Sequence, residues 1–228
     1  SVGGIINLGS IEHMGKVGLT TPIATFLNKY PGIEFKIEIG DTLSLMEKLV
    51  SSKIDVAFIA HLISKVNKQS NLESFNLSRF NMYTLVEDEY SVIVNNSHRF
   101  AKLEYVNWED LINEKLVILD KSYSLNNMIR GTFKSLGIEP SIVFESNQVD
   151  TLLGLINNNF GISLLSNKIA RVDYNIKVVK LNNSIKRNTV LAIAKENEKY
   201  DVIKKFAEHI ENFYEVNKKS VNKVSKKC

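Results

Sequence analysis

Cysteine is nearly absent from this sequence, because Cys228 is the single one among 228 residues. One cysteine excludes an internal disulfide framework and a CxxC metal or redox pair. Long apolar runs are missing as well, since no stretch reaches the roughly 18 consecutive apolar residues of a transmembrane helix. The first residues show no basic segment ahead of an apolar one, as a signal peptide would. We expect no membrane contact and a cytoplasmic location by default, although a mature secreted chain would also lack its signal.

The sequence also lacks the motifs of common enzymes. It contains no Gly-x-Ser-x-Gly elbow and no Walker loop, and His98 and His209 have no Ser or Cys partner at a recognisable spacing. His13 and His61 lack the spacing of metal ligands, and the pair of glycines at 15 and 18 is a weak phosphate-loop signal. We therefore predict that the chain is not an enzyme and holds no cofactor or metal.

The sequence has no excess of basic residues outside its last eleven positions. The net charge is +4, but five lysines fall in the last eleven residues with no acidic residue among them. Without these five, 24 basic residues remain against 25 acidic ones, so the charge of residues 1–217 gives no sign of a nucleic-acid-binding surface. Residues 218–228 are predicted to form a lysine-rich disordered tail, the alternative being an anion-binding arm.

What the sequence does contain is an alternation of strand-like and helix-like apolar patterns. The expected strands are 5–8, 35–39, 54–59, 82–86, 90–94, 116–119, 141–145, 161–165, 176–181 and 189–194. The expected helices are 21–30, 43–50, 125–136, 149–158 and 202–213. Residues 61–81 read as a long loop, and the acidic residues 87–89 as a hinge turn. This alternation predicts an α/β fold.

Local residues also predict where two helices begin. Thr21 precedes Pro22, and threonine caps a helix well when proline takes its first position. For the next helix the cap is Asp41 or Thr42, with a capping box from Ser44 as the competing alternative.

In their order and spacing, these patterns resemble the effector-binding domain of a LysR-type transcriptional regulator over about residues 4–214. The resemblance is carried by Gly9-Ser10, Phe26 to Pro31, Gly40-Asp41-Thr42 with Leu45 and Leu49, Ile54-Asp55-Val56-Ala57, Ser97 to Ala101, Asp110-Leu111 and Phe160-Gly161-Ile162. The sequence departs from the family's pattern at Arg99, Asn159 and Ser166. The family's N-terminal helix-turn-helix is not part of this sequence.

The resemblance implies a fold of two Rossmann-like lobes joined by crossover strands, similar to type II periplasmic binding proteins. The implied first lobe is 1–86 plus 188–217, and the second is 87–187. In this family an effector binds between the lobes, and two helices, here 21–30 and 43–50, pair across a homodimer. DNA would be bound only through the N-terminal domain that this sequence lacks.

Candidate effector-binding residues follow the expected strands, at the ends where loops open helices. They are Ser10, Ile11, Glu12 and His13 after the first strand, Thr42, the helix starts Ser122, Tyr123, Ser124 and Ser146, Asn147, and Phe160 as an aromatic wall. Free N–H groups at helix starts favour an anion, so a carboxylate or small oxyanion is the expected effector class. The alternative is that these residues are helix caps, solvated loops or core aromatics.

Two other functions remain open at this point. A solute-binding protein of a transporter shares the two-lobed fold, and an enzyme of the same fold is a more remote alternative. The leading hypothesis is the effector-sensing domain of a LysR-type regulator.

Overall fold

The computed structural model describes residues 3–12, 14–15, 18–166, 168 and 174–224. Its chain forms two compact units. The first unit comprises residues 1–60, 74–87 and 188–228, and the second comprises 61–73 and 88–187. The strands alternate with helices as the α/β prediction requires. Among the described helices, none combines the length and apolar composition that crossing a membrane requires.

The first unit is built on a sheet with the strand order β2-β1-β3-β10-β4. Its elements are β1 (Gly3–Ser10), α1 (Thr20–Lys29), β2 (Gly32–Ile39), α2 (Thr42–Val50), β3 (Val56–Ser64), η1 (Leu77–Arg79), β4 (Phe80–Asn95), β10 (Ile185–Ala194) and α5 (Asp201–Val224). β1 runs parallel to both of its neighbours, β2 and β3. The chain passes from one unit to the other four times, within β3, between residues 73 and 74, within β4 and within β10.

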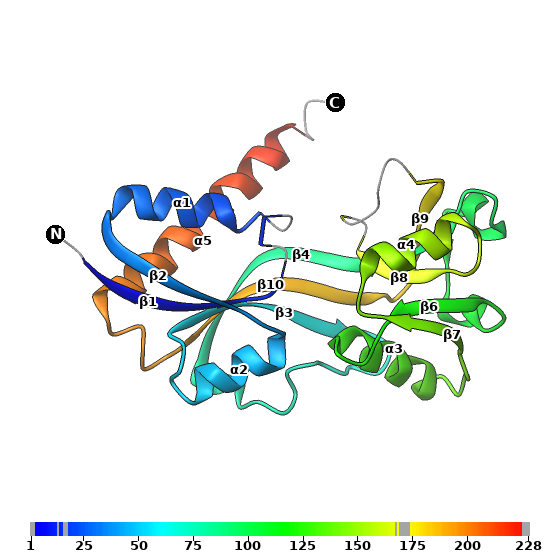
Figure 1. Ribbon diagram of the computed structural model, residues 1–228, viewed down its shortest axis with the longest axis horizontal. Helices are drawn as coiled ribbons and strands as arrows, with labels where there is room; N and C mark the ends of the chain where they lie inside the picture. Colours follow the sequence, from blue (N-terminus) through cyan, green and yellow to red (C-terminus); the bar gives the residue numbers. More distant parts are fainter. Residues whose placement is uncertain (1–2, 13, 16–17, 167, 169–173, 225–228) are drawn as a thin grey trace. The chain divides into compact units, whose positions relative to one another are not determined.

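Helices α1 and α5 lie on one face of this sheet and α2 lies on the other (Figure 1). Ile6 and Leu8 of β1 belong to the buried cluster that α1 and α5 cover. Gly9 points to the opposite face, where an added Cβ would lie 2.7 Å from side-chain atoms of both Leu45 and Ile54. Glycine at this position therefore permits the close approach of α2 to the end of β1.

An aromatic cluster packs α5 against the other elements of the first unit. The ring of Phe206 is fully buried and lies 5.1 Å from the rings of Phe26 and Phe35, measured between centroids, and 6.2 Å from that of Phe58. These partners come from α1, β2 and β3, so one side chain of the last helix contacts three earlier elements. Edge-to-face packing of this kind adds to the burial of apolar area.

The second unit contains a parallel pair and a mostly antiparallel group of strands. Its elements are η2 (Arg99–Lys102), β5 (Tyr105–Val106), η3 (Trp108–Leu111), β6 (Lys115–Leu119), α3 (Ser124–Ser135), β7 (Ser141–Ser146), α4 (Val149–Asn157), β8 (Ser163–Ser166) and β9 (Ile176–Leu181). β6 and β7 pair in parallel, and β4 pairs antiparallel with β8 and β9. The short elements β5, η2 and η3 have no counterpart in the sequence-based prediction.

Residues 61–73 belong to the second unit, whereas the prediction places them in the first lobe. Their backbone folds back on itself after β3, with an isolated bridge between Ile63 and Ser70. The Ser64 hydroxyl lies 3.0 Å from that of Thr132 on α3, and both residues are fully buried. Gly131 of α3 permits the close approach of the Gln69 side chain, since a Cβ at position 131 would lie 2.4 Å from its oxygen.

The chain leaves the first unit between Glu87 and Asp88, where the hinge is predicted, but the expected turn is wrong, because β4 continues through residues 87–89 as one strand. Asp88 favours turns, but the segment has no glycine or proline to require one. Asp88 is instead held along the strand: its carboxylate accepts hydrogen bonds from Glu89 N and Ser166 Oγ, both at 2.8 Å. Lys168 Nζ lies 3.9 Å away and offsets part of its charge.

The helix-start predictions have mixed outcomes. Thr21 does not cap α1, which begins one residue earlier with the buried Leu19 as its N-cap and no side-chain cap. Leu19 is anchored in the core, and that packing sets the start. In α2, Asp41 is the cap and accepts a hydrogen bond from Ser44 N at 3.0 Å. The alternatives at Thr42 and Ser44 are not used.

The prediction of a disordered tail is wrong for residues 218–224, which continue α5 to Val224. An existing helix adds further turns at low cost, and lysine is a good helix former. Residues 225–228 lie outside the described part of the chain.

Replacing Phe206 by alanine should lower the free energy of unfolding by about 3–5 kcal/mol, because it leaves a cavity among three elements. Urea denaturation followed by circular dichroism measures this change. Tyr200→Ala is the matched control, because Tyr200 is 54% exposed and its truncation should change stability by about 0.5 kcal/mol or less. Equal losses in the two variants would contradict the central role of Phe206.

Candidate ligand-binding site

The parallel strands of the first unit end together at one edge. Ser10, the last residue of β1, is in register with Ile39 of β2 and with Phe58 of β3. Beyond this point, Gly40 N donates to Ser10 O at 3.0 Å, and Ile11 N donates to Phe58 O at 3.1 Å. Loops at the carboxyl ends of parallel strands are the usual place of ligands in α/β sheets.

Four candidate residues lie at this edge, and we call them the first-unit polar edge: Ser10, Ile11, Glu12 and Thr42. Ser10 is fully buried and its hydroxyl donates to Ile11 O at 3.0 Å, while Ile11 itself is 7% exposed. Glu12 is exposed. His13, the remaining candidate of this loop, lies outside the described residues.

Thr42 joins the start of α2 to strand β3. Its hydroxyl donates to Ala60 O at 3.3 Å and accepts from Ala60 N at 3.1 Å, and the residue is 6% exposed. Since Asp41 serves as the cap, the Thr42 hydroxyl is not needed for capping. A hydroxyl oxygen has two acceptor sites, so one acceptor site remains beside the bond from Ala60 N.

The second unit has a corresponding edge where β6 and β7 end. Leu119 and Ser146 are in register there, and Asp120 N donates to Ser146 O at 3.0 Å. The Tyr123 hydroxyl donates to Asn147 O at 3.2 Å, which joins the loop before α3 to the loop before α4. The second-unit polar edge is the set Ser122, Tyr123, Ser124, Ser146 and Asn147.

The helix that starts at this edge, α3, has no side-chain cap. Its N-cap residue is Tyr123, whose side chain makes no cap hydrogen bond. The Ser122 hydroxyl, a predicted cap, donates instead to Asp120 Oδ1 at 2.5 Å. Backbone N–H groups at the start of an uncapped helix attract anions. α4 is also uncapped, but Asp150 in its first turn makes that start less favourable for an anion.

A buried hydrogen-bond network holds α3 against the ends of β6 and β7. Asn126 is fully buried, and its Nδ2 donates to Leu119 O and to Glu145 Oε1, each at 2.7 Å. Arg130 donates from Nε to Asn126 Oδ1 and from Nη2 to Glu145 Oε1, each at 2.9 Å. The hydrogen bonds from Asn126 and from Arg130 lower the pKa of Glu145. Sequence reasoning missed this network, although the i, i+4 spacing of Asn126 and Arg130 is a visible signal.

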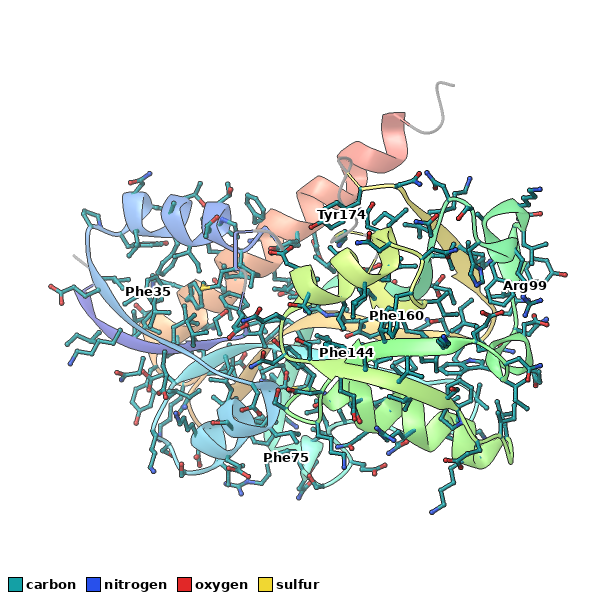
Figure 2. All side chains as sticks on the ribbon, turned by 45° about the vertical axis from the view of Figure 1, so that its right-hand side comes forward. Phe35, Phe75, Arg99, Phe144, Phe160 and Tyr174 are labelled. Atoms are coloured by element: carbon teal, nitrogen blue, oxygen red, sulfur yellow. The ribbon has the colours of Figure 1, made fainter. Side chains whose placement is uncertain are left out.

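Phe160 does not join the second-unit polar edge. It lies at the opposite end of β6, where Lys115 Nζ is 5.6 Å from its ring centroid and Ile162 N donates to Lys115 O at 2.9 Å. The ring is 43% exposed and, like that of Phe144, is labelled in Figure 2. Helix α4 carries the chain from the carboxyl ends of β6 and β7 back to their amino ends. Phe160 follows α4 and therefore lies at the amino end of β6, away from the second-unit polar edge.

Comparison with known proteins decides the family. A family model described as the LysR substrate binding domain matches residues 1–214. The chain belongs to this family. The match confirms the resemblance drawn from the order of motifs. Because the family is one of substrate-binding domains, it also agrees with the prediction that the chain is not an enzyme.

The relatives of this LysR substrate-binding domain are distant. "Uncharacterized HTH-type transcriptional regulator YybE" of Bacillus subtilis is 26% identical over 162 residues, which are 71% of this chain and 51% of that protein. The chain thus spans about half the length of this relative.

Solved structures confirm the fold. The effector-binding domain of QuiR, solved with shikimate, has a TM-score of 0.73 at 23% identity and covers 94% of this chain and 98% of its own. The effector-binding domain of BenM, solved with its effector benzoate, has a TM-score of 0.74 at 21% identity and 95% coverage of both chains. The domain therefore has the two-lobed α/β fold similar to periplasmic binding proteins.

Candidate metal ligands do not gather in the described part of this LysR domain. Within the ranges that the structure describes, no group of three or more His, Cys, Asp or Glu side chains is placed to hold a metal ion. His61 is partly buried, and burial lowers its pKa, but its Nε2 lies 2.9 Å from Ser70 Oγ within the fold-back of residues 61–73. It therefore serves that fold-back and lies on neither polar edge.

Glu145→Gln should destabilise the domain at neutral pH by an amount that shrinks in acid. Glu145 has a lowered pKa in the folded state, so its ionised form stabilises the fold fully above the unfolded-state value of about 4.3. That stabilisation is lost as the pH falls through the lower folded-state pKa. Unfolding free energies of wild type and variant, measured from pH 7 to pH 3, should converge at the acid end.

Glu139→Gln is the control for this measurement, because Glu139 is an exposed carboxylate beyond the end of α3. It should leave the unfolding free energy nearly unchanged across the same range. A difference between wild type and Glu145→Gln that stays constant down to pH 3 would contradict the role given to the ionised carboxylate.

Proposed function

We propose that this LysR substrate-binding domain is the effector-sensing part of a longer, DNA-binding transcription regulator that acts in the cytoplasm. The family match carries the proposal. It is supported by the Bacillus subtilis relative, which is named an HTH-type transcriptional regulator and is about twice as long as the region that matches this chain. DNA is bound by a part of the parent protein that this sequence does not include. A transporter's solute-binding protein shares the fold but is not favoured by the family match.

The proposed effector is a small carboxylate or oxyanion. The uncapped start of α3, with Ser124 as its first residue, supports this class. Two similar structures hold shikimate and benzoate, which are both carboxylic acids. In this proposal each polar edge is a candidate for effector contacts, and Thr42 of the first-unit polar edge is the first residue to test.

An effector regulates such a protein only by binding one of its conformations better than another. Binding at the polar edges would stabilise one conformation of the domain. The altered population would then change how a dimer presents its DNA-binding parts, which is an allosteric coupling between two distinct sites.

Exposed apolar residues of the first unit support a homodimer through the helices predicted at 21–30 and 43–50. On α2, Leu43 is 38% exposed and Val50 is 41% exposed. The adjoining edge strand β2 exposes Ile37 and Ile39 to 50% each. A row of partly exposed aliphatic side chains on an edge strand and its following helix is typical of a surface that another chain covers.

Native mass spectrometry of the purified domain tests the proposal by weighing any co-purified small molecule. A bound carboxylic acid or oxyanion is expected. Titration with benzoate and shikimate as first probes, followed by other small carboxylates, extends the test. Tight binding of only neutral or cationic molecules would overturn the proposed effector class.

Thr42→Val should weaken binding of the effector found in this way by about 0.5–1.5 kcal/mol, because it removes a hydroxyl and keeps the size of the side chain. It should also lower stability, since the two hydrogen bonds to Ala60 are lost. Isothermal titration calorimetry measures the affinity.

Thr42→Ser is the matched control, because it keeps the hydroxyl and should keep most of the affinity. If Thr42→Val lowers stability while the affinity stays unchanged, Thr42 only ties α2 to β3.

Leu43→Glu should shift the domain from dimer toward monomer, because it places a charge on the proposed dimer surface. Sedimentation velocity measures the change. Ile112→Glu, on a residue of the second unit with a similar exposure of 44%, is the control and should leave the dimer intact. A wild-type domain that stays monomeric at high micromolar concentration would contradict the proposed dimer.

A further inference from the structure

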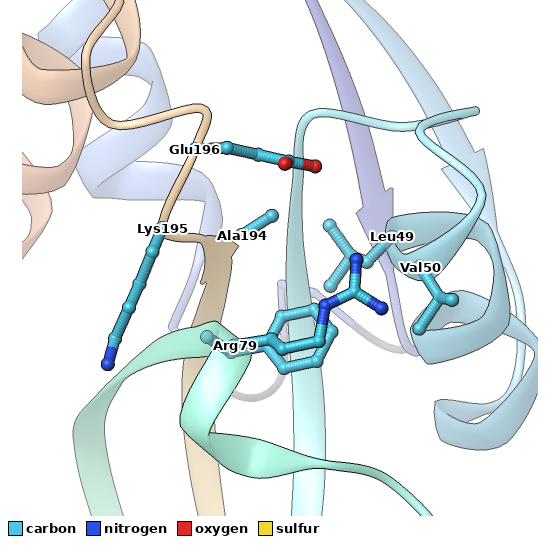
Figure 3. A pocket seen from close by; sticks show the side chains of 7 residues that line it. Leu49, Val50, Arg79, Ala194, Lys195 and Glu196 are labelled. Carbon is cyan, nitrogen blue, oxygen red and sulfur yellow. The ribbon is translucent and has the colours of Figure 1, made fainter.

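A groove on the first unit is lined by residues that belong to neither polar edge (Figure 3). It consists of two adjoining hollows of about 240 and 280 Å³ that share Val50, Arg79 and Phe80 as lining residues. It is formed by the last turn of α2, the segment from residue 74 to 80 and the turn after β10. Thr42 and Val50 are the first and last of the nine residues of α2, so the groove lies about 12 Å along this helix from the first-unit polar edge.

The floor of the groove is apolar and firmly packed. Leu49, Phe80 and Ala194 are 1%, 5% and 6% exposed, while the neighbouring Val50 remains 41% exposed. The backbone on both sides is tied together, since Lys195 N donates to Arg79 O at 3.0 Å. The groove is therefore preformed, and an apolar group that enters it would cover Val50 and gain about 25 cal/mol for each Å² of apolar surface removed from water.

Charged side chains of both signs line the groove, namely Arg79, Lys195, Glu47 and Glu196, and of these Arg79 and Glu196 flank the hollow over Leu49 and Ala194. Figure 3 shows the Arg79 side chain reaching toward Leu49 and Val50, with the Glu196 carboxylate on the other side of Leu49 and Ala194 and the Lys195 side chain pointing away. Among the residues that the structure describes, neither Arg79 nor Glu196 makes an ion pair or a side-chain hydrogen bond. Both side chains are exposed, so a ligand can reach them without breaking an existing pair.

We infer that this groove is a second small-molecule site and that its ligand is an α-amino acid with an aromatic or branched apolar side chain. The Arg79 guanidinium binds the carboxylate, for which its planar donors are suited. The Glu196 carboxylate accepts hydrogen bonds from the ammonium group. The apolar side chain lies on Val50 and Phe80.

The charges explain why a zwitterion fits better than a simple acid. A plain carboxylate would gain Arg79 but would meet Glu196 as a like charge, whereas an ammonium group on the same carbon turns that repulsion into attraction. The hollow that Val50, Arg79, Phe80 and Glu196 all line has a volume of about 240 Å³, which is below that of sites for drug-sized ligands and favours a molecule as small as an amino acid.

The groove shares no residue with the proposed effector site. Its lining residues all belong to the first unit, and they include no residue of either polar edge. Val50 is the one residue that the groove shares with the exposed apolar residues named for the proposed dimer, whose test residue, Leu43, lies at the other end of α2.

Isothermal titration of the whole chain with L-phenylalanine and L-leucine tests the inference. We expect binding of at least one of them at millimolar concentration. 3-Phenylpropanoate, which lacks the amino group, and 2-phenylethylamine, which lacks the carboxylate, should each bind about tenfold or more weakly than L-phenylalanine, since each loses a charged hydrogen-bonded pair. Absence of binding by both amino acids, or equal binding by 3-phenylpropanoate, would overturn the inference.

Variants locate the site and separate it from the effector site. Arg79→Gln and Glu196→Gln should each weaken amino-acid binding by about tenfold. Lys102→Gln, which removes an exposed cation of the second unit, and Thr42→Val should leave it unchanged. Loss of amino-acid binding in Thr42→Val with full retention in Arg79→Gln would overturn the groove assignment and place the amino acid at the first-unit polar edge.

Discussion

The parallel pairing of β1 with β2 and β3 is the constraint on which the first unit depends. Eight consecutive residues of β1 are in register with β2, and the last three are also in register with β3. All three strands therefore deliver their following loops to one edge, where Ser10 and Thr42 lie. Gly9 lets α2 pack close to the end of β1, and the Thr42 hydroxyl then ties the start of α2 to Ala60. The same few residues set both the packing of α2 and the polar edge.

The second unit reaches a similar arrangement through a buried polar network instead of a glycine. Asn126 bonds the end of β6 and a side chain of β7 at once, and Arg130 completes the set. A buried amide is tolerable only when its hydrogen bonds are satisfied, and here both ends of the Asn126 side chain have partners. These hydrogen bonds hold the start of α3 in place although no side chain caps this helix. Its N–H groups stay available for a ligand.

Helix α2 gives the first unit two different ends. Its start lies at the carboxyl edge of the parallel strands, and its last turn forms one wall of the groove that contains Arg79 and Glu196. If the groove binds an amino acid, α2 contributes residues to two small-molecule sites, one at each end of the helix.

The order and type of the main elements could be predicted from the sequence, because apolar periodicity and short polar breaks depend on residues close in the chain. The family could be predicted too, from weak motifs in a consistent order. The course of β4 could not be predicted in this way, because Ser166 of β8 and Lys168 hold Asp88 in a strand where local composition favours a turn. Only the tertiary structure decided this course, the side on which Phe160 lies, the Asn126 network and the groove at Arg79. Each of these depends on residues far apart in the sequence, whose approach no local pattern records.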